Sequence, residues 1–260
     1  MTRGLWNRET VALVLLAACL PVAMQWVRYE GLDALLRWVA VALTLGVWHL
    51  LFMLVRAQPP SFAALLTALA IAMLAPEELG LFRLALGISF GVVMGELVFG
   101  GWGRNVVHPA TVTLAFLGFG FPEYNWPELI QPIAWAVIPT ALIGAFSGTM
   151  PAAVLGSTLL VLGIAFINGV LPDGTLWAAA IILVLLVADP VTSAATTLGR
   201  WLNGSLYALL VLLFASSWSG AAPVQIAVAA ALLSSLAAPL LDEVAVALWI
   251  SARRRGHDQR

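Results

Sequence analysis

The segment "GELVFGGWGRNVVHPATVTLAF" (residues 95–116) lies between two apolar runs, residues 81–99 and 111–121, and it decides how the chain can fold. Its glycines are expected to end the first helix, because glycine is a poor helix former. Pro109 suits the first turn of a second, short helix, since proline has no N–H group to leave unpaired there. The segment therefore predicts a helix that is broken and then resumed.

The chain around this segment is too apolar for a soluble protein. Of its 260 residues, 62% are hydrophobic and 10% are charged, whereas soluble domains carry about 25% charged residues. These values exclude a soluble enzyme, a disordered protein and a nucleic-acid binder, and predict a polytopic protein of the lipid bilayer. The single cysteine, Cys19, cannot form an internal disulfide, and without a cysteine cluster no metal site is expected.

Ten apolar runs predict an all-α integral membrane protein with about ten transmembrane helices, some of them interrupted. A straight span needs roughly 20 apolar residues, and several runs are shorter. The runs are residues 11–27, 35–55, 62–74, 81–99, 111–121, 130–146, 152–167, 176–188, 205–218 and 224–250. The last run is long enough to include a break at Pro239. The first is interpreted as a retained span, because it lacks the small-residue cleavage site of a signal peptide.

The distribution of arginine predicts the orientation. An even number of spans places both termini on the same side, and all cations in the chain are arginines. If that side is the cytoplasm, the outer side holds only Arg28, Arg37 and Arg83, and the other arginines lie inside, as the positive-inside rule requires. Both termini are therefore predicted to be cytoplasmic.

Two stretches suggest an internal repeat within a single polytopic domain, residues 1–260. "ALAIAMLAPEELGLFRL" (residues 68–84) and "AAAIILVLLVADPVTSA" (residues 178–194) both contain an apolar run that stops at Ala-Pro or Ala-Asp-Pro. As the third elements of two halves, residues 1–125 and 126–260, they would cross the membrane in opposite senses. The prediction is two inverted five-helix repeats whose interrupted helices meet near the midplane.

The first polar segment supplies five candidate site residues, namely Gly100, Gly101, Gly103, Asn105 and His108. Non-helical backbone at membrane depth must be buried in protein or line a cavity. A helix that starts after His108 would direct its N–H groups into that cavity, which suits an anion or a cofactor phosphate. The alternative is an ordinary cytoplasmic turn before a helix that begins with proline.

The second polar segment, "VADPVTSAATTLGRWLNG" (residues 187–204), supplies Asp189, Thr192 and Thr196. An ionisable group at the end of an apolar run is a candidate functional residue in a membrane protein. The alternative makes Asp189 a helix N-cap and Arg200 a membrane anchor.

Three other polar residues are interpreted as structural. His49 is predicted to be a hydrogen-bonded core histidine and Glu96 to pair with Arg104. Asp242 is interpreted as facing the cytoplasm, with an ion relay as the alternative.

Together these segments resemble the NqrB/RnfD family, which holds membrane subunits of the sodium-pumping NADH:quinone reductase and of the Rnf electron-transport complex. In "FGGWGRNVVHPATVTLAFLGFGFP" (residues 99–122) the match is to Gly-Gly-x-Gly-x-Asn and then Asn-Pro-Ala, with His108 in place of the second asparagine. "ADPVTSAATTLGRWLNG" (residues 188–204) is similar to the family's Asp-Pro-Val-Thr segment. "APLLDEVAVALWISARRRGH" resembles its C-terminal stretch.

The resemblance implies a membrane subunit of an ion-translocating electron-transport complex in the bacterial inner membrane, with an architecture related to urea transporters. It implies partner subunits of a redox complex, and a flavin (FMN or riboflavin) or a quinone held non-covalently between the interrupted helices by the eight candidates. The chain is not expected to be catalytic alone, since it lacks a dinucleotide fingerprint and a metal-cluster site.

Covalent FMN is not expected. The family carries it on a threonine in a long loop, whereas the link at residues 122–130 is short here and Met150 stands where "FSGTMP" (residues 146–151) would need that threonine. Two alternatives remain open: a small-solute or ion transporter or channel, and an assembly subunit without a cofactor.

Overall fold

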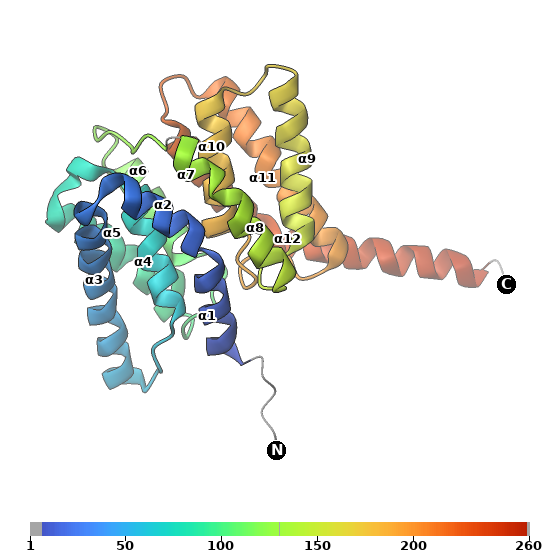
Figure 1. Ribbon diagram of the computed structural model, residues 1–260. Coiled ribbons are helices and arrows are strands. Elements are labelled where there is room, and N and C mark those ends of the chain that lie inside the picture. Colours follow the sequence, from blue (N-terminus) through green and yellow to red (C-terminus); the bar gives the residue numbers. More distant parts are fainter. Residues whose placement is uncertain (1–6, 130, 259–260) are drawn as a thin grey trace.

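The computed structural model describes residues 7–129 and 131–258, and this part of the chain is helical, without strands (Figure 1). Arg3 and Arg260, which contribute to the charge balance above, lie outside it. The helices are α1 (Arg8–Ala18), α2 (Leu20–Glu30), α3 (Leu32–Arg56), α4 (Ala63–Leu74), α5 (Gly80–Val92), α6 (Pro109–Gly120), α7 (Gln131–Trp135), α8 (Val137–Phe146), α9 (Ala152–Ile167), α10 (Asp173–Ile182), α11 (Thr197–Ser217) and α12 (Pro223–Asp258). Two π-helical turns, η2 (Val93–Leu97) and η3 (Leu183–Val187), extend α5 and α10, and the 3₁₀ turn η1 (Glu77–Leu79) precedes α5.

All ten predicted apolar runs are largely helical. Within the described residues, four helices are long and apolar enough to cross a membrane: α3, α5 with η2, α11 and α12. The pair α1 and α2, bent by 47° at Cys19, makes a fifth candidate span. The membrane character is thus confirmed, while the number of ten spans and the inverted repeat stay predictions.

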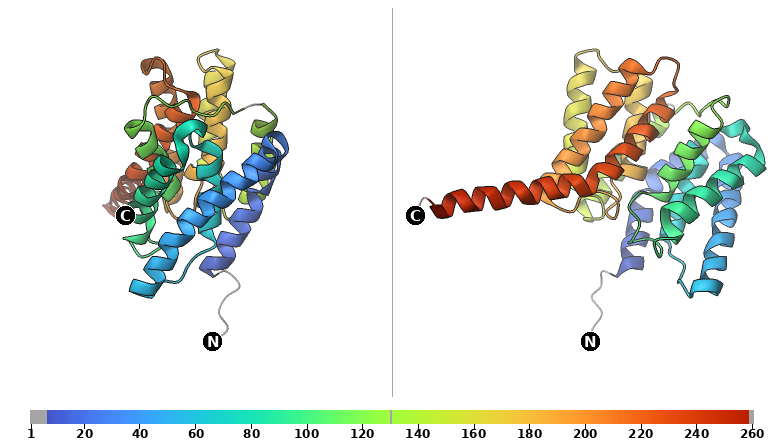
Figure 2. Two further views of the ribbon diagram at one scale, coloured as in Figure 1. Left: turned by 90° about the vertical axis from the view of Figure 1, so that its left-hand side faces the viewer. Right: turned by 180° about the vertical axis from the view of Figure 1, so that it is seen from behind.

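The expected break at Pro239 is wrong. The helix α12 continues through this proline to Asp258, because a proline removes one hydrogen bond and can bend a helix without ending it. Figure 2 shows the C-terminal part of α12 extending beyond the other helices. Its side chains there are apolar and exposed, including Leu248 and Trp249.

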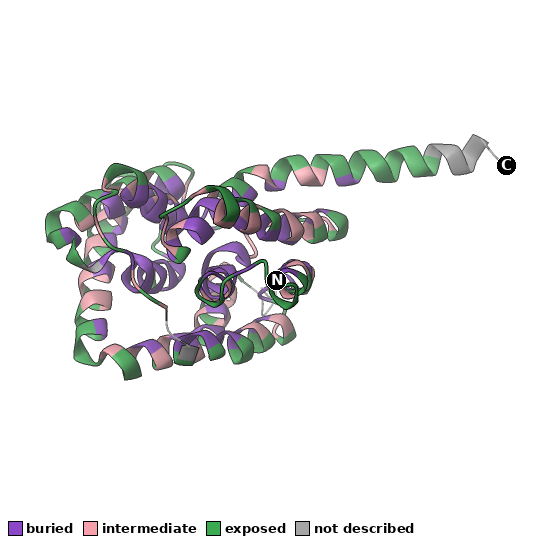
Figure 3. Cartoon of the chain, turned by 90° about the horizontal axis from the view of Figure 1, so that it is seen from above, coloured by how far each residue is buried: buried purple, intermediate pink, exposed green. Residues whose placement is uncertain are grey.

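Two short helices form the interior of the bundle. Every residue of α4 from Leu66 to Leu74 is buried, as is every residue from Ala178 to Asp189 in α10, η3 and the turn that follows. Figure 3 shows these buried positions surrounded by helices with exposed outer faces. Helices that are apolar all round need such an environment, whereas α3 exposes leucines in the way that a lipid-facing helix does.

Glycines allow the outer helices to approach each other closely. A Cβ atom at Gly91 of α5 would overlap Thr113 of α6, and one at Gly204 of α11 would overlap Ser157 and the Val154 carbonyl of α9. Small residues at helix contacts are typical of membrane bundles, where close packing replaces the hydrophobic effect as the source of attraction.

Three connecting segments meet at the end of the bundle where α1 begins. Arg8 and Glu9, in the first turn of α1, bind the segment 98–108 and the link between α3 and α4. Trp102 of the segment 98–108 packs in one buried cluster with Val191 of the segment 188–196. This end of the molecule is therefore where the polar residues predicted as a site come together.

Candidate functional site

The two interrupted segments are in contact. Trp102 is buried against Val191, Ala12 and Ala63, and its indole lies beside the Asp189 carboxyl. Its main-chain N–H donates to Glu96 Oε1 at 3.1 Å. A single tryptophan thus links a carboxyl group from each half of the chain.

The glycines of the first segment shape a tight loop. Gly100, Gly101 and Gly103 have φ angles of 105°, 92° and 99°, a region that side chains of L-residues rarely tolerate. A Cβ atom at Gly101 would also lie 2.6 Å from the side-chain amide of Gln58. These glycines end the helix, as predicted, and let the loop pack against the link between α3 and α4.

Asn105 and His108 hold this loop together. The Asn105 side chain accepts from the Gly103 N–H at 3.1 Å and donates to the Val107 carbonyl at 3.3 Å. His108 is the N-cap of α6, and its Nδ1 accepts from the Ala110 N–H at 3.2 Å. His108 lies outside the helices, and burial lowers its pKa to about 4, so it is neutral near pH 7 and caps the helix without a charge.

Asp189 closes a turn in the second segment. Its Oδ2 accepts from the N–H of Thr192 at 3.2 Å and from the hydroxyl of Thr192 at 3.0 Å. It is not a helix N-cap, because Thr196 takes that place at the start of α11. The other oxygen, Oδ1, is buried without a hydrogen-bond partner, and burial raises the pKa of Asp189, which follows the end of η3, to about 6.

Thr196 is fixed by a residue far along the chain. Its N–H and hydroxyl donate to Asp242 Oδ1 at 2.8 Å and 2.6 Å, and the Ala195 N–H donates to Asp242 Oδ2 at 2.7 Å. Asp242, which was interpreted as facing the cytoplasm, instead binds the second segment to α12. Arg200 also contributes, because its Nε donates to the Ala194 carbonyl at 3.1 Å.

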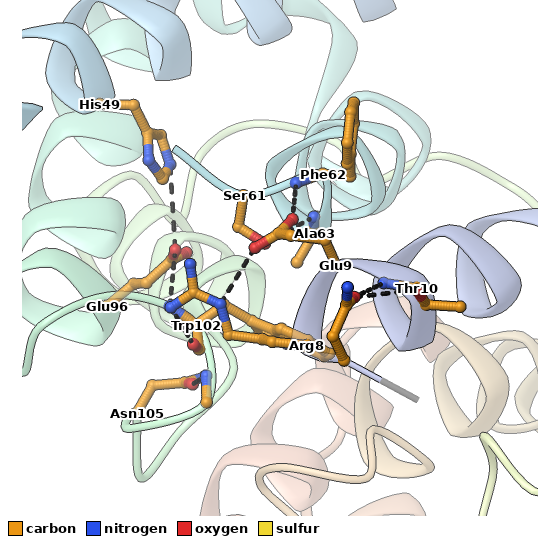
Figure 4. Close-up of polar contacts among 12 residues, drawn as sticks. Arg8, Glu9, Thr10, His49, Ser61, Phe62, Ala63, Glu96, Trp102 and Asn105 are labelled. Atoms are coloured by element: carbon orange, nitrogen blue, oxygen red, sulfur yellow. Dashed lines mark hydrogen bonds and ion pairs between the residues drawn. The ribbon is translucent and has the colours of Figure 1, made fainter. Parts of the chain in front are cut away.

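The first turn of α1 completes this end of the bundle (Figure 4). Arg8 donates to Glu9 at 3.0 Å and to the Trp102 carbonyl at 3.2 Å. Glu9 in turn accepts from the Ser61 hydroxyl and the Phe62 N–H, both at 3.0 Å. Neither contact was predicted, since the sequence presents Arg8 only as a charge that flanks an apolar run.

Glu96 and His49 depart from the sequence-based interpretation. Among the described residues, Glu96 lies 4.0 Å from His49 and forms no ion pair with Arg104 (Figure 4). His49 is buried but its Nε2 has no hydrogen-bond partner, and the same holds for Glu96 Oε2. The prediction missed this pair, because its members are far apart in the sequence.

The structure thus gathers Gly100, Gly101, Gly103, Asn105 and Asp189 around Trp102, whereas His108 caps α6 and Thr196 caps α11. The packing is dense. Four cavities open between the described helices, and none of the four is lined by Asn105, His108 or Asp189. A flavin ring system does not fit between the segments in this arrangement, so their role as cofactor-binding residues stays a prediction.

One of the four cavities reaches the edge of this cluster. It holds about 400 Å³ between α3 and α4, has walls of apolar side chains such as Leu50 and Met53, and is lined by His49 and Ser61. An apolar pocket with a few polar groups is the usual form of a small-molecule site.

Known proteins resemble this chain over most of its length. Residues 6–186 match the family described as NQR2, RnfD, RnfE. The Na(+)-translocating NADH-quinone reductase subunit that is designated B in Yersinia pestis is 26% identical over 279 aligned residues, which cover 84% of this chain and 67% of that protein. The subunits of the same name from Klebsiella pneumoniae strain 342 and Pseudomonas aeruginosa strain LESB58 are 32% and 43% identical over 149 and 77 residues.

These two matches cover 48% and 30% of this chain, and 36% and 19% of the relatives. The chain therefore spans between a fifth and two thirds of the length of these relatives. The family match ends before the segment 188–196, so it contains the first polar segment but not the second.

Proposed function

Since the chain belongs to the NQR2, RnfD, RnfE family, we propose that it is a membrane subunit of an ion-translocating electron-transport complex. Its relatives are named as a subunit of the Na(+)-translocating NADH-quinone reductase. Membrane helices and family membership support a subunit that works with redox partners in the inner membrane of a bacterium.

The finer architecture of this proposal is ten crossings in two inverted halves. Each half then contains a broken first element, α1 with α2 or α7 with α8, and a buried third element, α4 or α10 with η3. The two buried elements run in opposite directions (Figure 1), as the third elements of an inverted repeat do. Both end at a proline segment, Ala75-Pro76 or Asp189-Pro190.

The ligand that this arrangement suits best is a quinone rather than a flavin. The pocket between α3 and α4 opens on the outer face of the bundle, where the α3 side chains are apolar, and has His49 and Ser61 in its wall. A lipid-soluble ring with two carbonyl groups can enter such a pocket and accept hydrogen bonds there. The candidate residues of the two interrupted segments would then form the packed polar wall behind His49, through Glu96 and Trp102.

The observation that carries the proposal is the contact between the two segments at Trp102 and Asp189, with one buried carboxylate oxygen left unpaired. Asp189→Asn removes the charge and keeps the size of the side chain. It is expected to lower quinone reduction by the assembled complex about tenfold, equivalent to about 1.4 kcal/mol, while the bundle stays folded. Asp173→Asn, at the exposed start of α10, is the matched control.

Purification of the tagged chain from membranes distinguishes the other functions. Redox subunits that co-purify, with quinone reduction sensitive to Asp189→Asn, support the proposal. A protein that purifies alone and carries a solute or ion across liposome membranes is a transporter. Co-purification with full activity in Asp189→Asn indicates an assembly subunit and removes Asp189 from the site.

A further inference from the structure

His49 and Glu96 face each other inside the bundle without completing a hydrogen bond. His49 is on α3 and Glu96 on η2, and 4.0 Å separates Nε2 from Oε1 (Figure 4). Their side chains are only 7% and 1% exposed. His49 Nε2 and Glu96 Oε2 are both unpartnered, and a buried polar atom without a partner is costly. The geometry leaves these two groups able to satisfy each other through one added proton.

The pocket between α3 and α4 gives this pair a connection to the surface. His49 lines the pocket, whereas Glu96 lies behind His49 and is held by the Trp102 N–H at 3.1 Å. The rest of the wall is largely apolar and includes Gly46, which has open space around it. A proton can therefore reach His49 first and Glu96 second.

The charged groups around the pair already have partners. From α1, Arg8 donates to Glu9 and to the Trp102 carbonyl, and Glu9 accepts from Ser61 and Phe62. The Asp189 carboxyl of the second segment and the neutral His108 at the start of α6 complete the surroundings. The cation that faces Glu96 most directly is therefore the one that His49 forms when it takes up a proton.

We propose that His49 and Glu96 form a proton-binding site in which one proton is shared between Nε2 and the carboxylate and exchanges through the pocket between α3 and α4. A side-chain rotation that shortens the 4.0 Å separation by about 1 Å gives a charge-assisted hydrogen bond. The step adds one proton and transfers no electron. It does not depend on the quinone assignment, because the proton binds in the resting protein.

Titration of the purified full chain in lipid nanodiscs tests the pair. The infrared C=O band of protonated Glu96 is identified by its loss in Glu96→Gln, and the His49 nitrogen resonances by their loss in His49→Gln. A shared proton couples the two titrations, so His49→Gln is expected to move the midpoint of the Glu96 band by about one pH unit or more. Glu243→Gln, at an exposed position of α12, should leave it unchanged.

Independent titration would overturn the proposal: a Glu96 midpoint that is the same with and without His49 means that no proton is shared. If His49→Gln does not fold, the His49 resonances in Glu96→Gln give the same coupling from the other side. Repeating the titration in Asp189→Asn separates the influence of the Asp189 carboxyl from that of His49.

The access route has its own test. Gly46→Phe fills the pocket from a position where a side chain meets no neighbour within 4 Å. It is expected to slow hydrogen–deuterium exchange of the His49–Glu96 pair at least about tenfold, and Gly163→Phe, on the open face of α9, should not. Unchanged exchange in Gly46→Phe would exclude this pocket as the path of the proton.

Discussion

Asp242 shows how one carboxylate far along the sequence can order a whole segment. It accepts three hydrogen bonds of 2.6–2.8 Å from Ala195 and Thr196. Two of the donors are main-chain N–H groups at the start of α11, where helices leave their N–H groups unpaired. The same residue leaves no space for a side chain at Gly199. Asp242 therefore positions the segment that carries Asp189 and Thr192.

Removing this carboxylate should loosen the segment. Asp242→Ala leaves three donors without an acceptor, and hydrogen bonds to a charged group contribute about 1.5–3 kcal/mol each before compensation by water. Faster hydrogen exchange is expected at Ala195 and Thr196, together with a lower melting temperature. Hydrogen-exchange mass spectrometry measures the first effect and a thermal melt in detergent measures the second.

Glu243→Ala is the control, since the Glu243 side chain, next along the helix, is exposed. Equal exchange of residues 195–196 in both variants would mean that the segment is held by its own turn at Asp189 and not by α12.

Residue-scale predictions from the sequence succeed where the cause is local. The glycines at 100, 101 and 103 and the proline at 109 act on their own backbone, so the broken helix was predictable and is confirmed. The His49–Glu96 and Thr196–Asp242 pairs join residues that are distant in the sequence. No spacing rule in a single sequence connects them, because they meet only through the packing of whole helices.

At the scale of elements, close contact between α9 and α11 depends on Gly204. A Cβ atom there would overlap the Ser157 hydroxyl and the Val154 carbonyl, and the Thr158 hydroxyl donates to the Gly204 carbonyl at 3.0 Å. Backbone atoms cannot rotate away, so the two helices would have to separate.

Gly204→Ala is therefore expected to destabilise the bundle by about 1–3 kcal/mol, the usual cost of an overpacked core. Gly163→Ala is the matched control, because Gly163 of α9 has no neighbour within 4 Å of its Cβ position and alanine favours the helix. Unfolding in denaturing detergent, followed by circular dichroism, compares the two. Equal stability of both variants would show that α9 and α11 adjust without cost.

The limits of the sequence at this scale concern bends and continuity. The run at residues 11–27 gave no sign of the 47° bend at Cys19, and Pro239 suggested a break that α12 does not contain. Both outcomes depend on neighbouring helices. Tertiary contacts can bend an apolar helix and can also carry one past a proline. The helix bounds, in contrast, follow from glycine, proline and apolar length, and agree with most of the predicted runs.

At the scale of the molecule, contacts place the start of α1 and the later part of α12 at one end. Arg8 binds Trp102, Trp102 packs against Val191, and Asp242 binds Thr196 a few residues further along. The segment 121–129 lines a cavity with Gly174 and Pro223, near the starts of α10 and α12, and so lies at the opposite end. This arrangement is what an even number of crossings requires, and the arginine distribution assigns the first end to the cytoplasm.

Cysteine labelling tests this orientation, because the chain offers a quiet background: its one natural cysteine, Cys19, is buried. In spheroplasts, a membrane-impermeant maleimide is expected to label Glu123→Cys directly. It should label Asn7→Cys and Ser251→Cys only after the membrane is permeabilised. All three positions are exposed, so a difference in labelling reports the side of the membrane and not burial. Labels on opposite sides for residues 7 and 251 would require an odd number of crossings, and labelling of both in intact spheroplasts would reverse the orientation that the arginines predict.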